Sequence, residues 1–243
     1  SALDQISRIA RRRGIVVIED AAHAMGARYR KKPVGSLSDL TIFSFHPVKH
    51  MTTGEGGMVT TNREDLAARV RRFRQHGITK DPRELQRNEG PWYYEMHDLG
   101  FNYRLTDFQS ALGLSQLRKV GKFVSARRRI AAMYDGLLSK VEDVVRPVER
   151  PWATHSYHLY PVRVPARLRR RVFETLRARG IGVQVHYYPV HLQPYYRRRL
   201  GTGKGLCPNA EAFYASEISL PVFPAMNGGD VRRVVEELTR ALR

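Results

Sequence analysis

The chain has 243 residues, of which 42% are hydrophobic, and 42 lysine and arginine residues outnumber 23 acidic ones, giving a formal net charge of +19. This composition predicts a globular protein large enough for one or two domains and excludes a disordered chain, and no apolar run approaches the ~20 residues of a membrane span. We expect no specific nucleic-acid binding, because the arginine clusters fall beside probable helices and no nucleic-acid motif accompanies them. The single cysteine, Cys207, excludes an internal disulfide framework and favours a cytoplasmic location, as does the lack of a signal peptide.

The first elements predicted are a helix and a short strand. Apolar residues recur at helical spacing between Leu3 and Ala10, and Gly14 ends the helix. The run IVVIED, residues 15–20, is typical of a strand buried on both faces of a parallel sheet. Asp20 would then lie at the carboxyl end of a strand, where open α/β sheets bind ligands. A buried carboxylate there needs a cationic partner, and a protonated pyridine nitrogen would provide one.

The next stretch, residues 40–62, predicts a strand, a glycine-rich loop and a second strand. Lys49 lies in this loop and is one of only eight lysines in a chain that otherwise uses arginine for positive charge. An amine can lose its proton and attack a carbonyl, which a guanidinium cannot do. The neighbouring hydroxyls of Ser44, Thr52 and Thr53 and the loop glycines suit a covalently bound group. From these residues alone, an ordinary loop lysine on a β-hairpin is the favoured interpretation.

Further along, a helix is expected over residues 64–76, capped by Asn62 and ended by Gly77. Residues 78–98 predict a long polar and aromatic loop, which is either functional or poorly ordered. Thr106 and Gln109 predict a capping box for a helix that bends near residue 121 and runs to residue 140.

Two domains are predicted, residues 1–120 and residues 121–243. The second is expected to be a smaller α/β unit. Its predicted strands cover residues 157–164, 182–187 and 218–223, and its predicted helices cover residues 166–179, 209–216 and 229–242.

Five motifs in order resemble those of the DegT/StrS family of pyridoxal phosphate (PLP)-dependent sugar aminotransferases. They are EDAAHAMGA, VGSLSDLTIFSFHPVKHMTTGEGGMVTTN, LGFNYRLTDFQSALGLSQL, VQVHYYPVHLQPYY and ISLPVFPAMNGGDV. The resemblance covers essentially the whole chain and implies an α/β, fold-type-I transferase, with part of a large domain whose sheet is mainly parallel and a smaller C-terminal α/β domain. It also implies that an N-terminal portion of the large domain precedes this chain in complete members.

The resemblance assigns roles to individual residues. Lys49 matches the lysine that binds the cofactor covalently, and Asp20 matches the carboxylate on the pyridine nitrogen. His23 matches a residue lying against the cofactor ring or its phenolic oxygen. Ser44 matches a phosphate-binding hydroxyl.

Two further matches concern the partner subunit and the substrate. Asn102 matches an asparagine that reaches the cofactor phosphate from the other subunit of a homodimer. His186 lies where the family often contacts a sugar nucleotide, although a histidine on a strand is also often a satisfied core residue. The resemblance implies transfer of an amino group, with glutamate as the expected donor, to a nucleotide-linked keto-sugar. The HPVKHMTTGEGG and HYYPVHLQPYY stretches are most similar to enzymes that act on UDP-linked 4-keto-6-deoxy sugars of the pseudaminic-acid type.

Two alternatives to an active aminotransferase remain from the sequence. Some relatives are dehydratases with a histidine in place of the cofactor lysine, whereas Lys49 is present here. A chain lacking the N-terminal portion would alternatively be a catalytically inactive fragment. We expect no metal site, because Pro47 and the loop setting spoil the helical spacing of His46 and His50.

Overall fold

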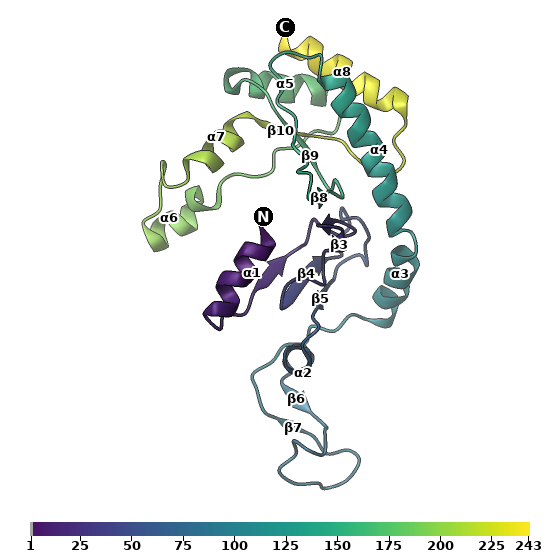
Figure 1. Cartoon of the computed structure of the whole chain (residues 1–243), viewed down its shortest axis with the longest axis vertical. Coiled ribbons are helices and arrows are strands. Elements are labelled where there is room, and N and C mark those ends of the chain that lie inside the picture. The colour runs from purple at the N-terminus through teal and green to yellow at the C-terminus, as the bar shows by residue number, and fades with distance from the viewer. Residues whose placement is uncertain (1) are drawn as a thin grey trace. The chain divides into compact units, whose positions relative to one another are not determined.

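The structure is a computed structural model, and it describes residues 2–243. The chain divides into two compact units, which are described separately (Figure 1). Unit 1 comprises Ser1–Gly121 and Trp152–Thr154, and unit 2 comprises Lys122–Pro151 and His155–Arg243. The first division therefore falls one residue from the predicted domain boundary, whereas the return of Trp152–Thr154 to unit 1 was not expected.

The centre of unit 1 is a three-stranded sheet in the order β1-β4-β5. Helix α1 (Leu3–Arg12) leads into β1 (Ile18–Asp20), which pairs in parallel with β4 (Leu40–Ser44). Strand β4 continues through the Lys49 loop into β5 (Gly57–Thr60), which is antiparallel to it. The mainly parallel sheet expected from the sequence is thus represented by one parallel and one antiparallel pairing.

Strand β1 is more exposed than the sequence predicts. The side chains of Ile15 and Ile18 are 56% and 61% exposed, and Asp20 is also exposed. The expectation of a strand buried on both faces, with a buried carboxylate at its end, is therefore wrong for residues 2–243. Within these residues β1 pairs only with β4, and no strand lies along its other edge.

A second small sheet in unit 1 joins segments far apart in the sequence. Strand β2 (Arg28–Tyr29) pairs with β3 (Lys32–Pro33) and, on its other side, with β8 (Ala153–Thr154). The turn between β2 and β3 consists of Arg30 and Lys31, both with positive φ, as a tight hairpin requires. The backbone N–H of Arg30 also donates to the carbonyl of Trp152 at 2.6 Å.

The predicted helix over residues 64–76 is shorter and differently capped. Helix α2 covers Glu64–Phe73, and its N-cap is Arg63 rather than Asn62. The Thr61 hydroxyl accepts the Arg63 N–H at 3.1 Å and so organises the turn that was assigned to Asn62.

The loop over residues 78–98 is folded on itself. Strands β6 (Ile78–Thr79) and β7 (Glu95–Met96) pair antiparallel at its base. The Glu95 carboxylate accepts hydrogen bonds from the backbone N–H of Gln86 at 2.9 Å and from the Tyr93 hydroxyl at 3.0 Å. It also lies 2.7 Å from His97 Nε2. One carboxylate therefore holds the loop together from inside.

Helix α3 (Asp107–Leu117) begins at the predicted capping box, which is confirmed. The Thr106 hydroxyl accepts from the backbone of Gln109, whose side chain accepts from the backbone of Thr106. The helix stops at Leu117, and α4 (Val120–Leu138) follows after a two-residue break beside the predicted bend.

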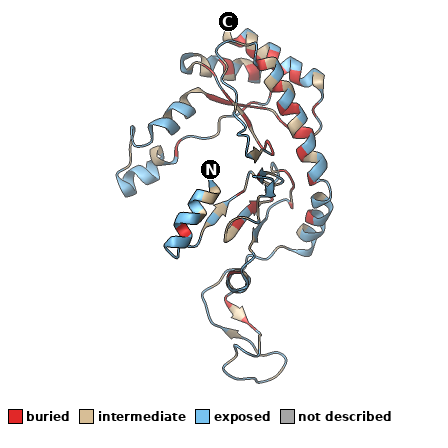
Figure 2. Cartoon of the chain, in the orientation of Figure 1, coloured by how far each residue is buried: buried red, intermediate tan, exposed pale blue. Residues whose placement is uncertain are grey.

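Unit 2 contains the larger core. Strand β9 (Tyr160–Arg163) pairs antiparallel with β10 (Glu217–Leu220). The helices that belong wholly to this unit are α5 (Ala166–Ala178), the 3₁₀ turn η1 (Val190–Leu192), α6 (Pro194–Leu200), α7 (Pro208–Ser216) and α8 (Gly228–Leu242). Figure 2 shows buried residues along α4, α5, α8 and both strands. The core includes the fully buried side chains of Tyr134, Tyr160, Leu176, Ile218 and Leu238.

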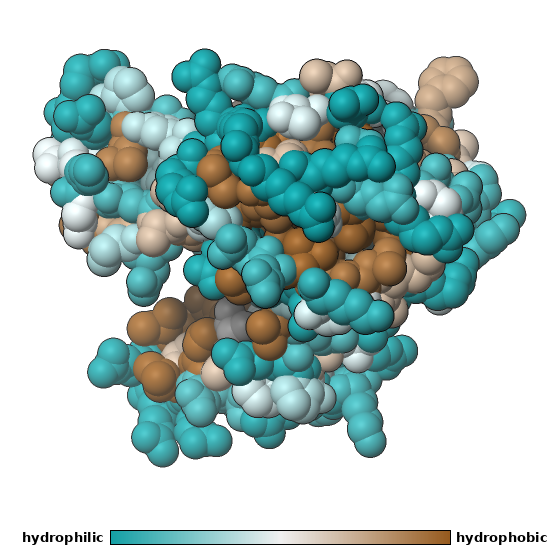
Figure 3. Space-filling model, turned by 90° about the horizontal axis from the view of Figure 1, so that it is seen from above, coloured by the Kyte–Doolittle hydropathy of each residue, from teal (hydrophilic) through white to brown (hydrophobic). Residues whose placement is uncertain are grey.

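Most residues of the arginine clusters are exposed, as the sequence predicts, but Arg127 is buried. Much of the face in Figure 3 is covered by hydrophilic side chains, with hydrophobic ones visible between them. Arg127 instead is only 6% exposed, and its guanidinium donates to the carbonyls of Val222, Tyr157 and His158 at 2.7–3.3 Å. These carbonyls lie near the end of the β-structure and give a buried cation its partners. No helix of residues 2–243 is long and apolar enough to cross a membrane.

Candidate functional site

The loop that carries Lys49 is closed by backbone hydrogen bonds at its base. Phe45 donates its N–H to Gly56 at 2.9 Å, and Thr53 donates to the carbonyl of Phe45 at 3.0 Å. Inside the loop, the N–H of Lys49 donates to the carbonyl of His46 at 3.0 Å. Met51, with a side chain 4% exposed, anchors the loop in the core of unit 1. The position of Lys49 is therefore set by a folded turn.

The three hydroxyls around Lys49 differ in what they do. Thr52 donates to the carbonyl of Phe45 at 3.0 Å, and the buried Thr53 donates to the carbonyl of Glu55 at 2.6 Å. Both shape the loop. Ser44, at the end of β4, accepts the N–H of His46 at 3.3 Å, which leaves its own O–H proton for another acceptor. Among these three, Ser44 is the hydroxyl suited to a ligand.

Lys49 and Asp20 lie at the same edge of the sheet. Asp20 ends β1 and is in register with Ile42 of β4, and Lys49 lies in the loop into which β4 leads. Because the two strands are parallel, their carboxyl ends point the same way. The two charges interact: partial burial lowers the pKa of the Lys49 amine, and the Asp20 carboxylate offsets part of this effect. The net pKa of Lys49 is below its ordinary value, which increases the fraction of neutral, nucleophilic amine.

The turn after β1 contains the next predicted residue. The Asp20 carboxylate accepts the N–H of Ala22 at 3.0 Å, which fixes the carboxylate toward the start of this turn. His23 lies in the same turn and is exposed. The structure thus brings Asp20, Lys49 and Ser44 to one edge of the sheet, with His23 on the segment that leaves it.

Asn102 lies in a different part of unit 1. It forms an isolated antiparallel bridge with Gln75, just after α2, and it is exposed. The Gln75 side chain in turn accepts from Arg104 at 2.9 Å. No hydrogen bond described for residues 2–243 joins Asn102 to the Lys49 loop.

His186, in unit 2, is the centre of a hydrogen-bonded group that the sequence did not indicate. Its backbone N–H donates to Glu217 Oε2 at 2.8 Å, and its ring Nδ1 lies 2.9 Å from Ser219 Oγ. Ser219 donates to Glu217 Oε1 at 2.5 Å. Glu217 is fully buried and Ser219 is 4% exposed. A signal for this group was available, because Glu217 and Ser219 are two residues apart on a strand and therefore share a face.

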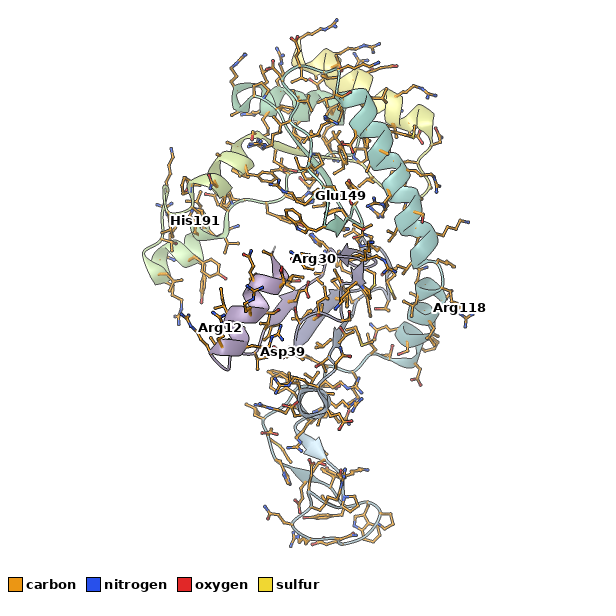
Figure 4. The ribbon with its side chains drawn as sticks, viewed as in Figure 1. Arg12, Arg30, Asp39, Arg118, Glu149 and His191 are labelled. Atoms are coloured by element: carbon orange, nitrogen blue, oxygen red, sulfur yellow. The ribbon has the colours of Figure 1, made fainter. Side chains whose placement is uncertain are left out.

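A cavity of about 330 Å³ lies in the same unit, lined by Tyr188, Leu192, Arg197, Lys204, Glu211 and Tyr214. The rings of Tyr188 and Tyr214 meet edge to face at 5.2 Å. His191, labelled in Figure 4 on the segment before α6, pairs with Glu211 at 2.8 Å, which holds this segment to α7. No group of three or more metal-ligating side chains occurs in the part of the chain described.

Comparison with known proteins relates this arrangement to characterised enzymes. The chain is 38% identical over 239 residues to the UDP-4-amino-4,6-dideoxy-N-acetyl-beta-L-altrosamine transaminase of Campylobacter jejuni. The alignment covers 97% of this chain and 61% of that enzyme.

Two solved structures have the same fold. Helicobacter pylori PseC, an aminotransferase of pseudaminic-acid biosynthesis, superposes with a TM-score of 0.90 at 30% identity, over 100% of this chain and 63% of that one. DesV of S. venezuelae, solved in complex with a ketimine intermediate, gives a TM-score of 0.86 at 32% identity, over 100% and 62%. The chain therefore spans somewhat less than two thirds of the length of these relatives.

These structures confirm the α/β class expected from the sequence, since they are fold-type-I transferases. A family model leads to the same family. The model of the DegT/DnrJ/EryC1/StrS aminotransferases matches residues 1–239, nearly the whole sequence. On this evidence, the chain belongs to the DegT/DnrJ/EryC1/StrS aminotransferase family.

Proposed function

We propose that this chain is the lysine-bearing part of a pyridoxal phosphate-dependent sugar aminotransferase. In this proposal the enzyme transfers an amino group from an amino acid, with glutamate as the expected donor, to a nucleotide-linked keto-sugar. The observation that carries the proposal is a lysine with a lowered pKa beside a carboxylate, at the carboxyl edge of two parallel strands. We also propose that the enzyme acts in the cytoplasm, in keeping with its single cysteine.

The residues present fit the three polar parts of pyridoxal phosphate. Lys49 offers an amine for the aldehyde, Asp20 offers a carboxylate for the pyridine nitrogen, and Ser44 offers a hydroxyl for the phosphate. Ser44 is the hydroxyl assigned to the phosphate because the hydroxyls of Thr52 and Thr53 already donate to carbonyls within the loop. When bound, the cofactor supplies a ring that accepts electrons from the carbon that loses its proton.

Each residue then has a defined task. The neutral amine of Lys49 would hold the cofactor and, when free, would serve as the base that takes up and returns a carbon-bound proton. The negative charge of Asp20 holds a proton on the pyridine nitrogen. His23 would lie against the ring, and His186 would contact the sugar nucleotide.

The dehydratase alternative is not favoured. That reaction is associated in this family with a histidine at the lysine position, whereas here an amine of lowered pKa occupies it. An incomplete fragment that binds the cofactor poorly and catalyses nothing by itself is the remaining alternative, since the relatives are longer. Measuring cofactor attachment separately from turnover distinguishes an active aminotransferase from such a fragment.

The proposed substrate class is a UDP-linked 4-keto-6-deoxy sugar. This proposal is supported by the likeness to the Campylobacter jejuni transaminase, whose name gives a UDP-linked 4-amino-4,6-dideoxy sugar, and to PseC, described as an aminotransferase of pseudaminic-acid biosynthesis. The excess of positive charge on the chain is consistent with an anionic substrate.

We further propose that the enzyme is a homodimer. Residues 92–117 expose an unusual number of large apolar side chains, including Leu99 at 80% and Phe108 at 90%. Large apolar side chains that stay exposed in number are typical of an interaction surface. Asn102 lies within this stretch, so dimer formation would place it against the partner subunit, where the family match assigns it to the cofactor phosphate.

The test is an absorbance titration of the chain with pyridoxal phosphate, followed by borohydride reduction and peptide mapping. We expect a visible band that borohydride removes and a reduced adduct on the peptide containing Lys49. Lys49→Ala should lack both, whereas Lys80→Ala, which removes an exposed lysine of the same unit, should retain both. Absence of the adduct from the wild-type chain, or its retention in Lys49→Ala, would refute the lysine assignment.

A further inference from the structure

The hydrogen bonds around His186 have a defined direction. Both carboxylate oxygens of Glu217 act as acceptors, one from the His186 backbone N–H at 2.8 Å and one from the Ser219 hydroxyl at 2.5 Å. A hydroxyl has one proton to donate. With Glu217 ionised, Ser219 gives that proton to the carboxylate, so the Ser219 oxygen accepts from His186 Nδ1 across their 2.9 Å contact.

This direction decides which ring nitrogen carries the proton. In a neutral imidazole one nitrogen is a donor and the other an acceptor, and the partner of one nitrogen fixes the tautomer. Here Nδ1 must be the donor, so Nε2 is the acceptor. The arrangement is rigid, because Glu217 is fully buried, Ser219 is 4% exposed, and the backbones of Ser219 and Gln184 exchange two hydrogen bonds.

We propose that Glu217 and Ser219 are positioning residues that hold His186 in the Nδ1–H tautomer, so that Nε2 accepts a hydrogen bond from a hydroxyl or amide N–H of the sugar. This specificity role rests on the proposed function, because it assumes that His186 faces the sugar nucleotide. It assigns to the site a preference for a donor group on the sugar. A carbonyl or other pure acceptor at the same position would face a lone pair and be rejected.

The burial of Glu217 explains why a carboxylate is needed. Burial raises the pKa of Glu217 above its ordinary value, and the hydrogen bonds from Ser219 and His186 and the charge of Arg169 offset only part of this rise in favour of the carboxylate. A neutral amide would not preserve the pattern, because one of its two polar ends is a donor. In Glu217→Gln the side-chain amide can take two orientations. In one, its NH₂ faces the His186 N–H, which places two donors against each other. In the other, its NH₂ donates to the Ser219 oxygen, and the Ser219 hydroxyl then turns its proton toward His186.

The test is a long-range ¹H–¹⁵N spectrum of the histidine-labelled chain, recorded well above the ordinary imidazole pKa of about 6.5. The His186 signals are assigned by their loss in His186→Gln. We expect the Nδ1–H pattern in the wild type and its reversal to Nε2–H in Glu217→Gln. Ser219→Ala removes the acceptor and should abolish the Nδ1–H preference. Ser216→Ala is the matched control, because the Ser216 hydroxyl donates to carbonyls of its own helix.

The outcomes separate the two proposals. An Nε2–H pattern in the wild-type chain overturns the positioning role without requiring any variant to fold. The specificity role is tested by calorimetric titration with UDP-N-acetylglucosamine, whose hydroxyl and amide groups are donors. We expect about tenfold weaker binding in Glu217→Gln and no change in Ser216→Ala. Unchanged affinity alongside a reversed tautomer refutes the specificity role. If the wild type does not bind the probe, the sugar-nucleotide proposal fails while the tautomer assignment is still decided by the spectrum.

Discussion

A Cβ atom on Gly57 would lie 2.7 Å from the carbonyl oxygen of Phe43, across the antiparallel pair β4–β5 that supports the Lys49 loop. We therefore expect Gly57→Ala to force the two strands apart and to lower the free energy of unfolding by about 1–3 kcal/mol, as overpacked sites do. Urea denaturation provides the measurement. Gly121→Ala, where a Cβ meets open space, should be neutral or slightly stabilising. Equal stability of the two variants would show that the strands can move apart at no cost.

The pKa of Lys49 predicts its reactivity. Because burial lowers this pKa, Lys49 should be acetylated by acetic anhydride at lower pH than the other lysines of the chain. Asp20 raises the pKa, so Asp20→Asn should shift the labelling midpoint of Lys49 to still lower pH. Competitive labelling read by mass spectrometry gives the midpoint. Glu55→Gln removes a charge from the same loop without removing a cause of the shift and should leave the midpoint unchanged. A higher midpoint in Asp20→Asn would contradict the proposed pairing.

The loop over residues 78–98 should respond to acid through Glu95. Hydrogen bonds from His97, from the Gln86 backbone and from Tyr93 lower the pKa of Glu95 to about 2. A lowered carboxyl pKa contributes stability above the ordinary value of the unfolded chain, and this contribution is lost as the pH falls toward about 2. We expect hydrogen-exchange protection of the Gln86 amide to persist through mild acid and to disappear in Glu95→Ala at any pH, because alanine offers no acceptor. Glu89→Ala, which removes only an exposed ion pair with Arg87, should keep the protection. Protection that survives in Glu95→Ala would assign the order of the loop to other contacts.

The homodimer proposal makes a prediction about Phe108. This side chain is 90% exposed, and replacing it with serine should weaken the dimer by removing apolar area from the interface, with about tenfold higher dissociation constant. Sedimentation velocity over a concentration series measures the effect. Leu206→Ser changes another exposed apolar residue outside residues 92–117 and is the control. Equal dissociation constants for the two variants would exclude this surface.

Local patterns predicted the elements best. The Thr106–Gln109 capping box was visible in four residues and is present, since its hydrogen bonds span only one helical turn. The strand predicted over residues 182–187 is reduced to a single bridge, Gln184 to Ser219. The reason is that the N–H of His186 donates to the Glu217 side chain, which ends the backbone ladder. Such a side-chain competitor is distant in sequence and cannot be read from the strand itself.

In the candidate site, too, contacts that depend on distant parts of the fold could not be predicted from the sequence. The common site of Asp20 and Lys49 was implied by the family resemblance, whereas the residues alone placed Asp20 only at the carboxyl end of a strand and did not predict that its strand pairs with the one before Lys49. The use of Thr52 and Thr53 inside the loop could not, since it depends on which carbonyls the folded turn presents. Glu217 and Ser219 were missed because β10 pairs across the unit with a segment more than thirty residues away.

The short strand β8 has a consequence for dividing the protein. Ala153 and Thr154 complete the sheet of β2 and β3, although the chain on both sides of them belongs to unit 2. A gene truncated after residue 121 would leave β2 with one open edge and Arg30 without its carbonyl partner. The two units are therefore not separable at a single peptide bond, and an independently expressed unit 1 would need residues 152–154 supplied as a grafted or added strand.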